Sequence, residues 1–289
     1  MFKKKSLALI LSAIVASALA FALSACSSNG SEKAEQASED GSKAAESAQV
    51  LKVGASPSPH AEILKAAIPE LEKEGVKLEV VEFTDYIQPN VALSNKELDA
   101  NYFQHKPYLD NYNKENKTDL EVVVPVHFEA MAVYGGKSKD LANVADGAQI
   151  AIPNDPTNEA RALLLLQEQG LLKLKDGAGL EATPKDIVEN PKNIKFVEVE
   201  AAAVPASLTS ADFAVINGNY ALGAGLNPKD ALAVESVESE AGKTYSNYLV
   251  ARPDNKDSES IQKLAKVLNS EAIAKFINDT YSGSVLPAF

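Results

Sequence analysis

The sequence predicts an α/β fold, because segments patterned like buried strands alternate with segments patterned like amphipathic helices along most of the chain. Residues 50–83 give the clearest example. A strand, a helix and a second strand follow one another there, which predicts a parallel pair joined by a crossover helix. The apolar run 149–152 begins a similar unit, since a strong helix pattern follows it. The sequence shows no internal repeat.

The first unit is well punctuated. Residues 50–55 predict a buried strand, and the Ser/Pro pairs 56–59 supply an N-cap and a proline at the first helical position. Apolar side chains then recur on one helical face until Gly75, a residue suited to ending a helix. Residues 77–83 alternate as a second strand.

The central part begins with a polar and aromatic region, 84–116, followed by an apolar strand, 122–126, that continues in an extended manner to Tyr134. The helix after the run 149–152 has Asp155 or Asn154 as cap, Pro156 in its first turn and Gly170 at its close. Further strands are predicted at 193–199, 213–216 and 246–252. A closing helical region is predicted at 258–278, with a candidate break at Asn269-Ser270.

Polar side chains suited to binding a ligand follow several of these strands. In open α/β sheets, ligands bind beyond the carboxyl ends of the strands. This repeated arrangement predicts two lobes.

The N-terminus has the layout of a secretory signal. Lys3, Lys4 and Lys5 precede an apolar run, 7–23, and small residues lead into Cys26. The ending resembles a bacterial lipobox, so residues 1–25 are predicted to be a signal peptide that is removed and Cys26 to be lipidated. An uncleaved membrane anchor and a buried thiol are the alternatives.

Residues 26–49 have almost no large apolar side chain and predict a disordered tether from Cys26. More than one acyl chain gives stable anchoring. We therefore expect a lipid-anchored domain on the extracytoplasmic face of the cell membrane.

Composition excludes several classes of protein. The formal net charge is −12, and a surface this acidic repels phosphate backbones, so no nucleic-acid partner is expected. Cys26 is the single cysteine, which leaves no disulfide to support the fold. No second long apolar run follows the first, and the region after the tether is long enough to bury a core of its own.

The sequence contains no enzyme signature. It has neither a Gly-x-Ser-x-Gly elbow nor a Gly-rich phosphate loop, and no cofactor is expected. The three histidines, His60, His105 and His127, are widely separated. A metal site combining His105, His127 and a carboxylate is conceivable, but spacing gives it no support, and no metal is predicted.

Arg161 is the first candidate for ligand binding, because the chain has only one other arginine, Arg252. A guanidinium grips a carboxylate bidentately, which lysine cannot do, and Arg161 lies in the second turn of its helix, near the positive end. The alternative is a surface arginine paired with Glu159 or another acid. Asn217 follows a buried strand and either contacts a ligand or caps a turn.

The aromatic and histidine candidates are open to a structural interpretation as well. Tyr86 and Phe103 are residue types that occur more often in cores than in sites, and His105 and His127 are equally compatible with hydrogen-bonded structural roles.

Several stretches taken together resemble one family. They are Val53–Leu64, Phe83–Asn90, Asp99–Leu109, Ile152–Leu163 and Ala214–Ala221. The chain resembles the NlpA/MetQ-type methionine-binding lipoproteins of ABC importers from Val50 to its C-terminus, and the lipobox fits the same family.

The resemblance implies a two-lobed periplasmic-binding-protein-like fold of type II, with a ligand cleft between the lobes. Lobe 1 would comprise 50–131 plus 247–289, and lobe 2 would comprise 132–246. The chain would cross between them near Met131–Tyr134 and Tyr245–Val250. The ligand would be L-methionine, and the partners would be an ABC permease and its ATPase.

The resemblance also implies the site. Tyr86, Phe103, His105 and His127 would form an aromatic and histidine cage, and Arg161 would bind the carboxylate. Asn217 and Asn247 would bind the backbone ends of the amino acid, with Asn158 as a further candidate. Residues 241–247 depart from the Glu-Ser-Pro-Tyr lead-in common in the family, although Tyr245 and Asn247 keep its spacing.

Two other functions remain alternatives at this stage. The same fold could bind another apolar amino acid or a methionine-containing peptide. A surface adhesion or interaction lipoprotein without a transport role is the second alternative.

Overall fold

The computed structural model describes residues 49–236 and 244–289, all within one compact unit, Glu46–Phe289. Cys26, the predicted signal peptide and the tether up to residue 48 lie outside the described residues. Within the described ranges, no helix combines the length and the apolar character needed to cross a membrane.

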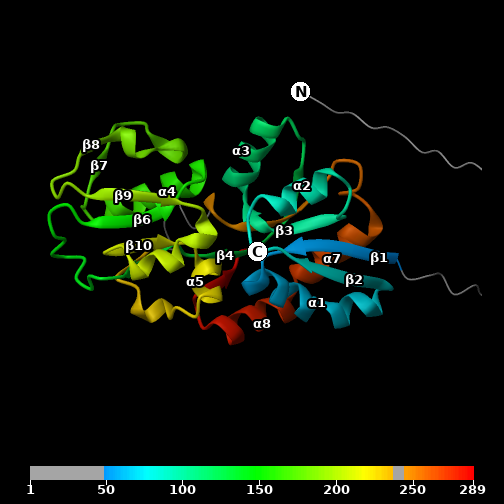
Figure 1. Ribbon diagram of the computed structural model, residues 1–289. Helices are drawn as coiled ribbons and strands as arrows, with labels where there is room; N and C mark the ends of the chain where they lie inside the picture. Colours follow the sequence, from blue (N-terminus) through cyan, green and yellow to red (C-terminus); the bar gives the residue numbers. More distant parts are fainter. Residues whose placement is uncertain (1–48, 237–243) are drawn as a thin grey trace, which may run out of the picture. The chain divides into compact units, whose positions relative to one another are not determined.

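The larger sheet has six strands in the order β13-β4-β12-β3-β1-β2. Figure 1 labels four of them, β1, β2, β3 and β4. The pair β1–β2 is parallel and joined through helix α1, which confirms the predicted strand-helix-strand unit. Strand β12 enters between β3 and β4, antiparallel to both. The strands span Gln49–Ala55 (β1), Val76–Glu82 (β2), Ala100–His105 (β3), Glu121–Glu129 (β4), Asn247–Ala251 (β12) and Val285–Pro287 (β13).

The second sheet has five strands in the order β11-β5-β10-β6-β9, and a two-stranded sheet pairs β7 with β8. Strands β10, β6 and β9 run parallel, whereas β5 is antiparallel to β10 and β11. These strands span Ala132–Gly135 (β5), Gln149–Pro153 (β6), Lys173–Leu174 (β7), Ile187–Glu189 (β8), Lys195–Val199 (β9), Phe213–Ile216 (β10) and Ala233–Val234 (β11).

The predicted helix ends and the predicted helix break are confirmed. Gly75 and Gly170 have positive φ just beyond α1 and α4, and the predicted break at Asn269-Ser270 separates α7 from α8. The helices are Glu62–Lys73 (α1), Gln88–Ser94 (α2), Lys106–Asn116 (α3), Pro156–Glu168 (α4), Gly218–Gly223 (α5), Glu259–Leu268 (α7) and Glu271–Tyr281 (α8).

One predicted helix start was wrong. Residues Pro57–Ala61 form a short separate turn, η1, in which Ser58 is extended, and Ser56 makes no side-chain capping bond. Helix α1 therefore begins at Glu62 and not at the prolines. The extended residue before Pro59 is expected, because proline disfavours the helical conformation of the residue that precedes it.

The region 84–116 contains α2, β3 and α3, none of which the sequence pattern predicts. Strand β3 is buried at every position although half of its residues are polar. Its polar side chains bind one another and α2: Asn101 Nδ2 donates to Asn90 Oδ1 at 2.8 Å, and Gln104 Nε2 donates to the same oxygen at 2.7 Å. Because these polar groups are hydrogen-bonded inside the fold, a central buried strand can contain residues that are typical of a loop.

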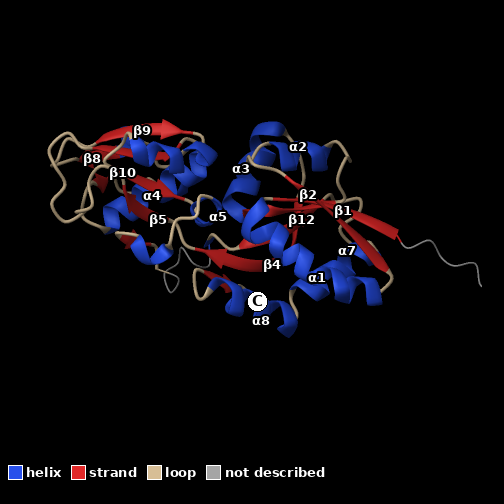
Figure 2. Cartoon of the chain, turned by 60° about the horizontal axis from the view of Figure 1, so that its bottom comes forward, coloured by secondary structure: helices blue, strands red, loops and turns tan. Residues whose placement is uncertain are grey.

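Each large sheet has its own core. One core packs α1, α7 and α8 against the six-stranded sheet, and another packs α4 against the five-stranded sheet. Figure 2 shows the strands of the two sheets as two separate groups. The chain passes from β4 to β5 through Ala130-Met131 and returns between β11 and β12, so two connections join the sheets.

Candidate ligand-binding site

The register of the six-stranded sheet brings together three predicted site residues from distant parts of the chain. Asn247, the first residue of β12, lies opposite His105 on one side and His127 on the other. Neighbouring strands are about 4.8 Å apart, so the three residues form a row across the sheet. This placement explains why a position so late in the chain belongs with the histidines.

A buried pocket lies where residues from both large sheets meet, and seven of the eight predicted ligand-binding residues line it. His127 is the exception. The lining comprises Tyr86, Phe103, Gln104, His105, Tyr108, Glu129, Asn158, Arg161, Asn217, Gly218 and Asn247.

The room inside this pocket is small. The centre of a water-sized sphere has about 10 Å³ available, enough for about one water molecule. A larger ligand therefore requires the lining to move apart.

Three aromatic rings form the apolar side of the pocket. The ring centroids of Tyr86, Phe103 and Tyr108 lie 5.9 Å from one another in each pairing. Tyr108 Oη donates to the backbone oxygen of Tyr86 at 2.9 Å, and Tyr86 Oη donates to Asn219 Oδ1 at 2.5 Å. These bonds hold the rings in place, and Tyr108 is a lining residue that the sequence analysis did not select.

Arg161 is buried, with only 3% of its surface exposed. Its Nε donates to Glu235 Oε1 at 3.0 Å, Nη2 contacts Glu235 Oε2, and Nη2 also donates to the backbone oxygen of Glu129 at 3.1 Å. The alternative of a surface arginine paired with Glu159 or another acid is therefore wrong about the surface position and about Glu159, although Arg161 does pair with another acid, Glu235. Its Nη1 makes no hydrogen bond to any residue that the structure describes, which leaves one edge of the guanidinium available.

Arg161 also connects the two sheets. Glu129 ends β4 and Glu235 follows β11, so one side chain of α4 binds both connecting segments. The segments pair directly as well, since the backbone N–H of Glu235 donates to the oxygen of Met131 at 2.9 Å.

Asn158 is the hub of the polar side. Of the two predicted caps, Asp155 and Asn154, it is Asp155 that caps α4, and Asn158 Nδ2 donates to Asp155 Oδ1 at 2.9 Å. Asn158 Oδ1 then accepts from Asn217 Nδ2 at 2.8 Å and from His105 Nε2 at 3.1 Å. Asn217 therefore binds Asn158 and makes no side-chain cap of α5.

His105 has a defined protonation state. Its Nδ1 accepts from the backbone N–H of Tyr108 at 3.2 Å, so Nε2 carries the proton that is donated to Asn158. Burial lowers the pKa of His105 to about 3, and the ring is neutral at physiological pH.

Two buried acceptors in the lining have no hydrogen-bond partner among the described residues: Asn217 Oδ1 and Glu129 Oε2. The two residues lie near each other, because Gly218 directly follows Asn217 in the chain and a Cβ atom added to Gly218 would lie 3.0 Å from Glu129 Oε2. Each unsatisfied buried acceptor costs about 1–3 kcal/mol. The arrangement therefore favours a ligand that brings hydrogen-bond donors. Burial also raises the pKa of Glu129 to about 7.

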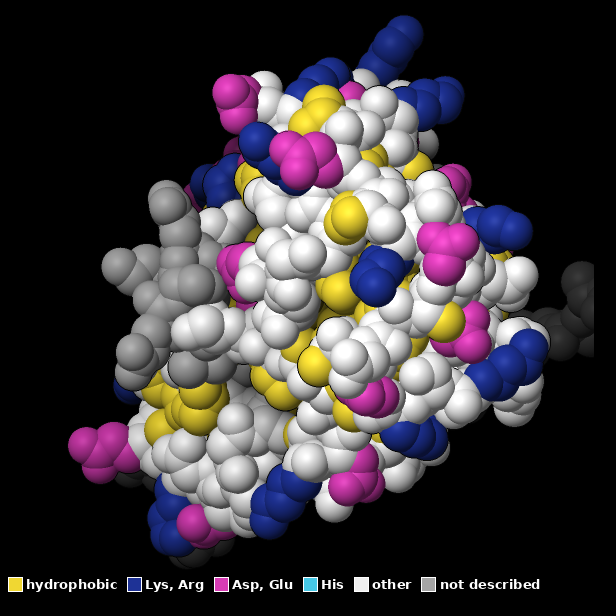
Figure 3. All heavy atoms as spheres, turned by 90° about the vertical axis from the view of Figure 1, so that its left-hand side faces the viewer, with side chains coloured by type: hydrophobic (Ala, Val, Ile, Leu, Met, Phe, Trp, Pro, Cys, Tyr) yellow, Lys and Arg dark blue, Asp and Glu magenta, His cyan; other side chains and the backbone are white. Residues whose placement is uncertain are grey.

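His127 lies behind Glu129, beside His60 and Tyr102, and contacts Tyr102 Oη through Nδ1. His105 instead lies with Asn158, so the structure does not bring His105 and His127 together with a carboxylate. All three histidines are buried, and the face drawn in Figure 3 shows acidic and basic side chains interspersed without a histidine.

Two sheets with separate cores, two connections between them and a polar pocket lined from both define a two-lobed substrate-binding protein. The family model for NlpA lipoprotein matches residues 51–289, and the chain belongs to this family.

Relatives cover most of the chain. The D-methionine-binding lipoprotein MetQ of Salmonella typhimurium is 47% identical over 218 residues, which are 74% of this chain and 79% of that protein. Outer membrane lipoprotein 2 of Mannheimia haemolytica is 40% identical, over 94% of this chain and 96% of that one. A nutrient-binding protein from Burkholderia cenocepacia, solved bound to methionine, is 44% identical with a TM-score of 0.79, over 83% of this chain and all of that one (100%).

Proposed function

We propose that this protein binds methionine and delivers it to the permease and ATPase of an ABC importer, while lipidated Cys26 anchors it to the extracytoplasmic face of the membrane. The named relatives support the ligand and the lipoprotein character. The observation that carries the proposal is a pocket whose unpaired groups complement a zwitterion and whose remaining side is aromatic.

The charged ends of an amino acid match this lining. The free edge of Arg161 would bind the carboxylate in a charge-assisted bond. The unpaired oxygens of Glu129 and Asn217 would accept from the ammonium group. Asn247 and Asn158 complete the polar side. The charged ends of a buried ligand need hydrogen-bonding or oppositely charged partners, and these side chains would supply them without an added ion.

The side chain of the ligand would lie among Tyr86, Phe103 and Tyr108. A thioether is polarisable, and each sulfur–aromatic contact contributes about 0.3–1.5 kcal/mol. Several rings around one sulfur would favour methionine over norleucine, which has the same length without sulfur.

Release and capture would occur by hinge motion. We assign lobe 1 to 50–131 plus 247–289 and lobe 2 to 132–246, which agrees with the sheet membership of every described strand. The small volume of the pocket corresponds to closed lobes that must part for the ligand to enter. The ligand would stabilise the closed form by binding it more tightly than the open one.

Calorimetric titration of the full-length protein in detergent, stripped of bound amino acids, tests the proposal. We expect tight one-to-one binding of L- or D-methionine and weaker binding of norleucine. Arg161→Lys should weaken methionine binding by roughly 100-fold, because the lost charge-assisted bonds are worth about 1.5–3 kcal/mol each.

Arg252→Lys is the matched control, since it makes the same change at the only other arginine. Arg252 lies outside the pocket and binds Asp254 and the backbone oxygen of Leu93. Equal losses in both variants would contradict the role of Arg161. No heat with methionine but heat with another amino acid or peptide would reassign the ligand. No small ligand at all would favour a surface interaction role.

A further inference from the structure

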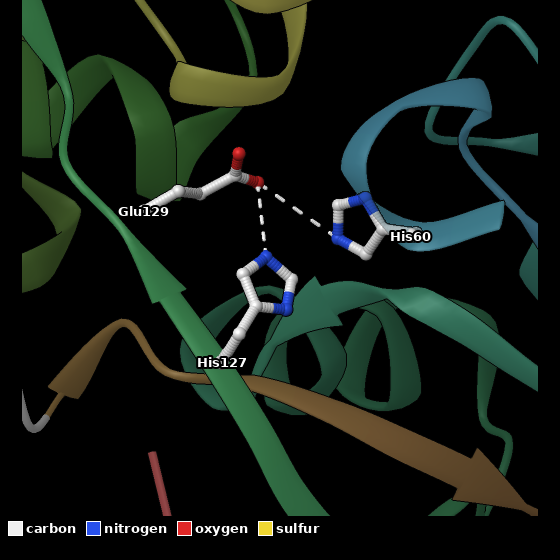
Figure 4. Close-up of side chains that lie close together, drawn as sticks. All are labelled: His60, His127 and Glu129. Carbon is white, nitrogen blue, oxygen red and sulfur yellow. Dashed lines mark ion pairs between the residues drawn. The ribbon is translucent and has the colours of Figure 1, made fainter. Parts of the chain in front are cut away.

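Three buried side chains that methionine binding does not fully use converge beside the pocket: His60, His127 and Glu129 (Figure 4). His60 comes from η1, and the other two come from β4, two residues apart on one face of the strand. The exposed fractions are 0%, 0% and 5%. Their donor atoms all lie within 4.8 Å of one another.

The spacing is too long for hydrogen bonds. Glu129 Oε1 lies 3.7 Å from His127 Nε2 and 3.8 Å from His60 Nε2. Burial lowers the pKa of His60 to about 4 and that of His127 to about 3, so both rings are neutral at physiological pH and these contacts are not ion pairs. His127 Nε2 has no hydrogen-bond partner among the described residues.

A shared cation fits between these groups once the two histidine rings move toward each other. With bonds of about 2.1 Å, the carboxylate oxygen and each imidazole nitrogen, 3.7–3.8 Å apart, need a shift of only about 0.3–0.4 Å to reach a tetrahedral angle. The longest separation among the three donor atoms is up to 4.8 Å, more than the roughly 4.2 Å that two such bonds can span, so the rings must approach each other by up to about 1.4 Å. Two neutral imidazoles and one carboxylate are a ligand set for zinc and related transition metals. The hydrogen bond between His127 Nδ1 and Tyr102 Oη is the outer contact that orients a metal-bound imidazole.

We propose that His60, His127 and Glu129 form a binding site for a divalent transition-metal cation of the Zn²⁺ class. The cation would reach it through the ligand pocket, because Glu129 lines that pocket. His60 Nε2 is within 2.9 Å of Asn247 Oδ1, so the cation displaces this hydrogen bond and shifts Asn247. Since Glu129 and Asn247 also belong to the proposed amino-acid site, the cation and methionine oppose each other's binding.

Cobalt titration tests the site without reference to methionine. The full-length protein is stripped with a chelator and titrated with Co²⁺ at about pH 8, above the pKa of Glu129, which burial raises to about 7. We expect one equivalent of Co²⁺ to give the visible bands of four- or five-coordinate cobalt. Zn²⁺ should displace it and raise the temperature of unfolding.

Variants locate the bound ion. His127→Gln and Glu129→Gln should each weaken Co²⁺ binding by about 100-fold or more, because loss of an outer contact alone costs about 10–100-fold. His105→Gln is the matched control, because it removes a buried neutral histidine outside the cluster and should leave the cobalt spectrum unchanged. His60→Gln replaces any variant whose thermal transition shows that it does not fold.

Absence of cobalt bands in the folded wild-type protein would overturn the proposal. Bands that persist in every folded cluster variant would overturn it as well. Either result is independent of whether methionine binds.

Discussion

The pair formed by Arg161 and Glu235 is the central interaction at the scale of single residues. It orients the guanidinium toward the pocket and holds the segment after β11 against α4. An arginine paired on one edge by a buried carboxylate loses little freedom when it binds a second carboxylate on another edge. Glu235 therefore acts as a positioning residue for the proposed ligand contact.

Glu235→Gln should lower the free energy of unfolding by about 3–5 kcal/mol, because it leaves a buried guanidinium without its counter-charge. Urea unfolding measures this. Glu121→Gln is the control: it breaks the partly exposed pair with Lys256 and should cost about 0–1 kcal/mol. Similar costs for the two variants would show that the buried pair has no special role.

Arg161 could be selected from the sequence because arginine is so rare in this chain. Glu129 and Glu235 could not, because they are two among 40 acidic residues and nothing local distinguishes them. Only burial at the two inter-sheet connections sets them apart. Tyr108 was visible as part of an aromatic region, but its orientation depends on α3, which the sequence pattern did not predict.

At the scale of elements, the start of α4 links folding to the site. The sequence predicted Asp155 or Asn154 as the cap, and the structure shows that Asp155 is the cap and that it also fixes Asn158, which binds both His105 and Asn217. The central strand β3 was missed because its polar side chains pair inside the fold, which a linear hydrophobic pattern does not reveal.

Asp155→Ala should lower stability by about 0.5–2 kcal/mol through loss of the cap and should also weaken methionine binding, because Asn158 loses its support. Ser270→Ala is the control, since Ser270 caps α8 by accepting from the backbone N–H of Ile273, away from the pocket. Calorimetry and urea unfolding separate the two effects. Unchanged binding in Asp155→Ala would show that Asn158 is placed without the cap.

At the scale of the whole molecule, the buried histidines make stability depend on pH. The pKa is about 4 for His60 and about 3 for His105 and His127 in the folded protein, against an ordinary value of 6.5. Below about pH 6.5 the unfolded chain binds protons that the folded protein does not, so stability falls as pH drops. Glu129 has the opposite effect on stability: burial raises its pKa from 4.5 to about 7, so the folded protein binds a proton that the unfolded chain does not, and stability rises as pH falls from about 7 to 4.5.

We expect the melting temperature to fall between about pH 6.5 and pH 4, since three histidines oppose two carboxyl groups, Glu129 and Glu159, whose pKa burial raises to about 7, and Asp155, whose pKa burial also raises. His127→Gln should flatten this fall, whereas Glu129→Gln should steepen it, because it removes the opposing group. Melting curves recorded across this range test both signs. Parallel curves for all three proteins would contradict the assignment.

The two-lobed arrangement was predicted from the resemblance together with the strand order, and the two-lobed fold is confirmed. The lipid anchor stays a prediction, because Cys26 lies outside the described residues. Cys26→Ser should move the protein from the membrane fraction to the soluble fraction or leave an unprocessed precursor, which fractionation and mass spectrometry would detect. Unchanged membrane association of a processed Cys26→Ser protein would exclude lipidation as the anchor.

The aromatic side of the pocket has an optical consequence. The chain contains nine tyrosines and no tryptophan, so tyrosine emission is not lost by energy transfer to an indole. The ring centroid of Tyr86 lies 4.8 Å from that of Tyr220 and 5.9 Å from that of Tyr108, and Tyr86 and Tyr108 line the pocket. A ligand that packs against Tyr86 and Tyr108 changes the surroundings of this tyrosine group, and the unlabelled protein thereby reports its own occupancy by ultraviolet fluorescence.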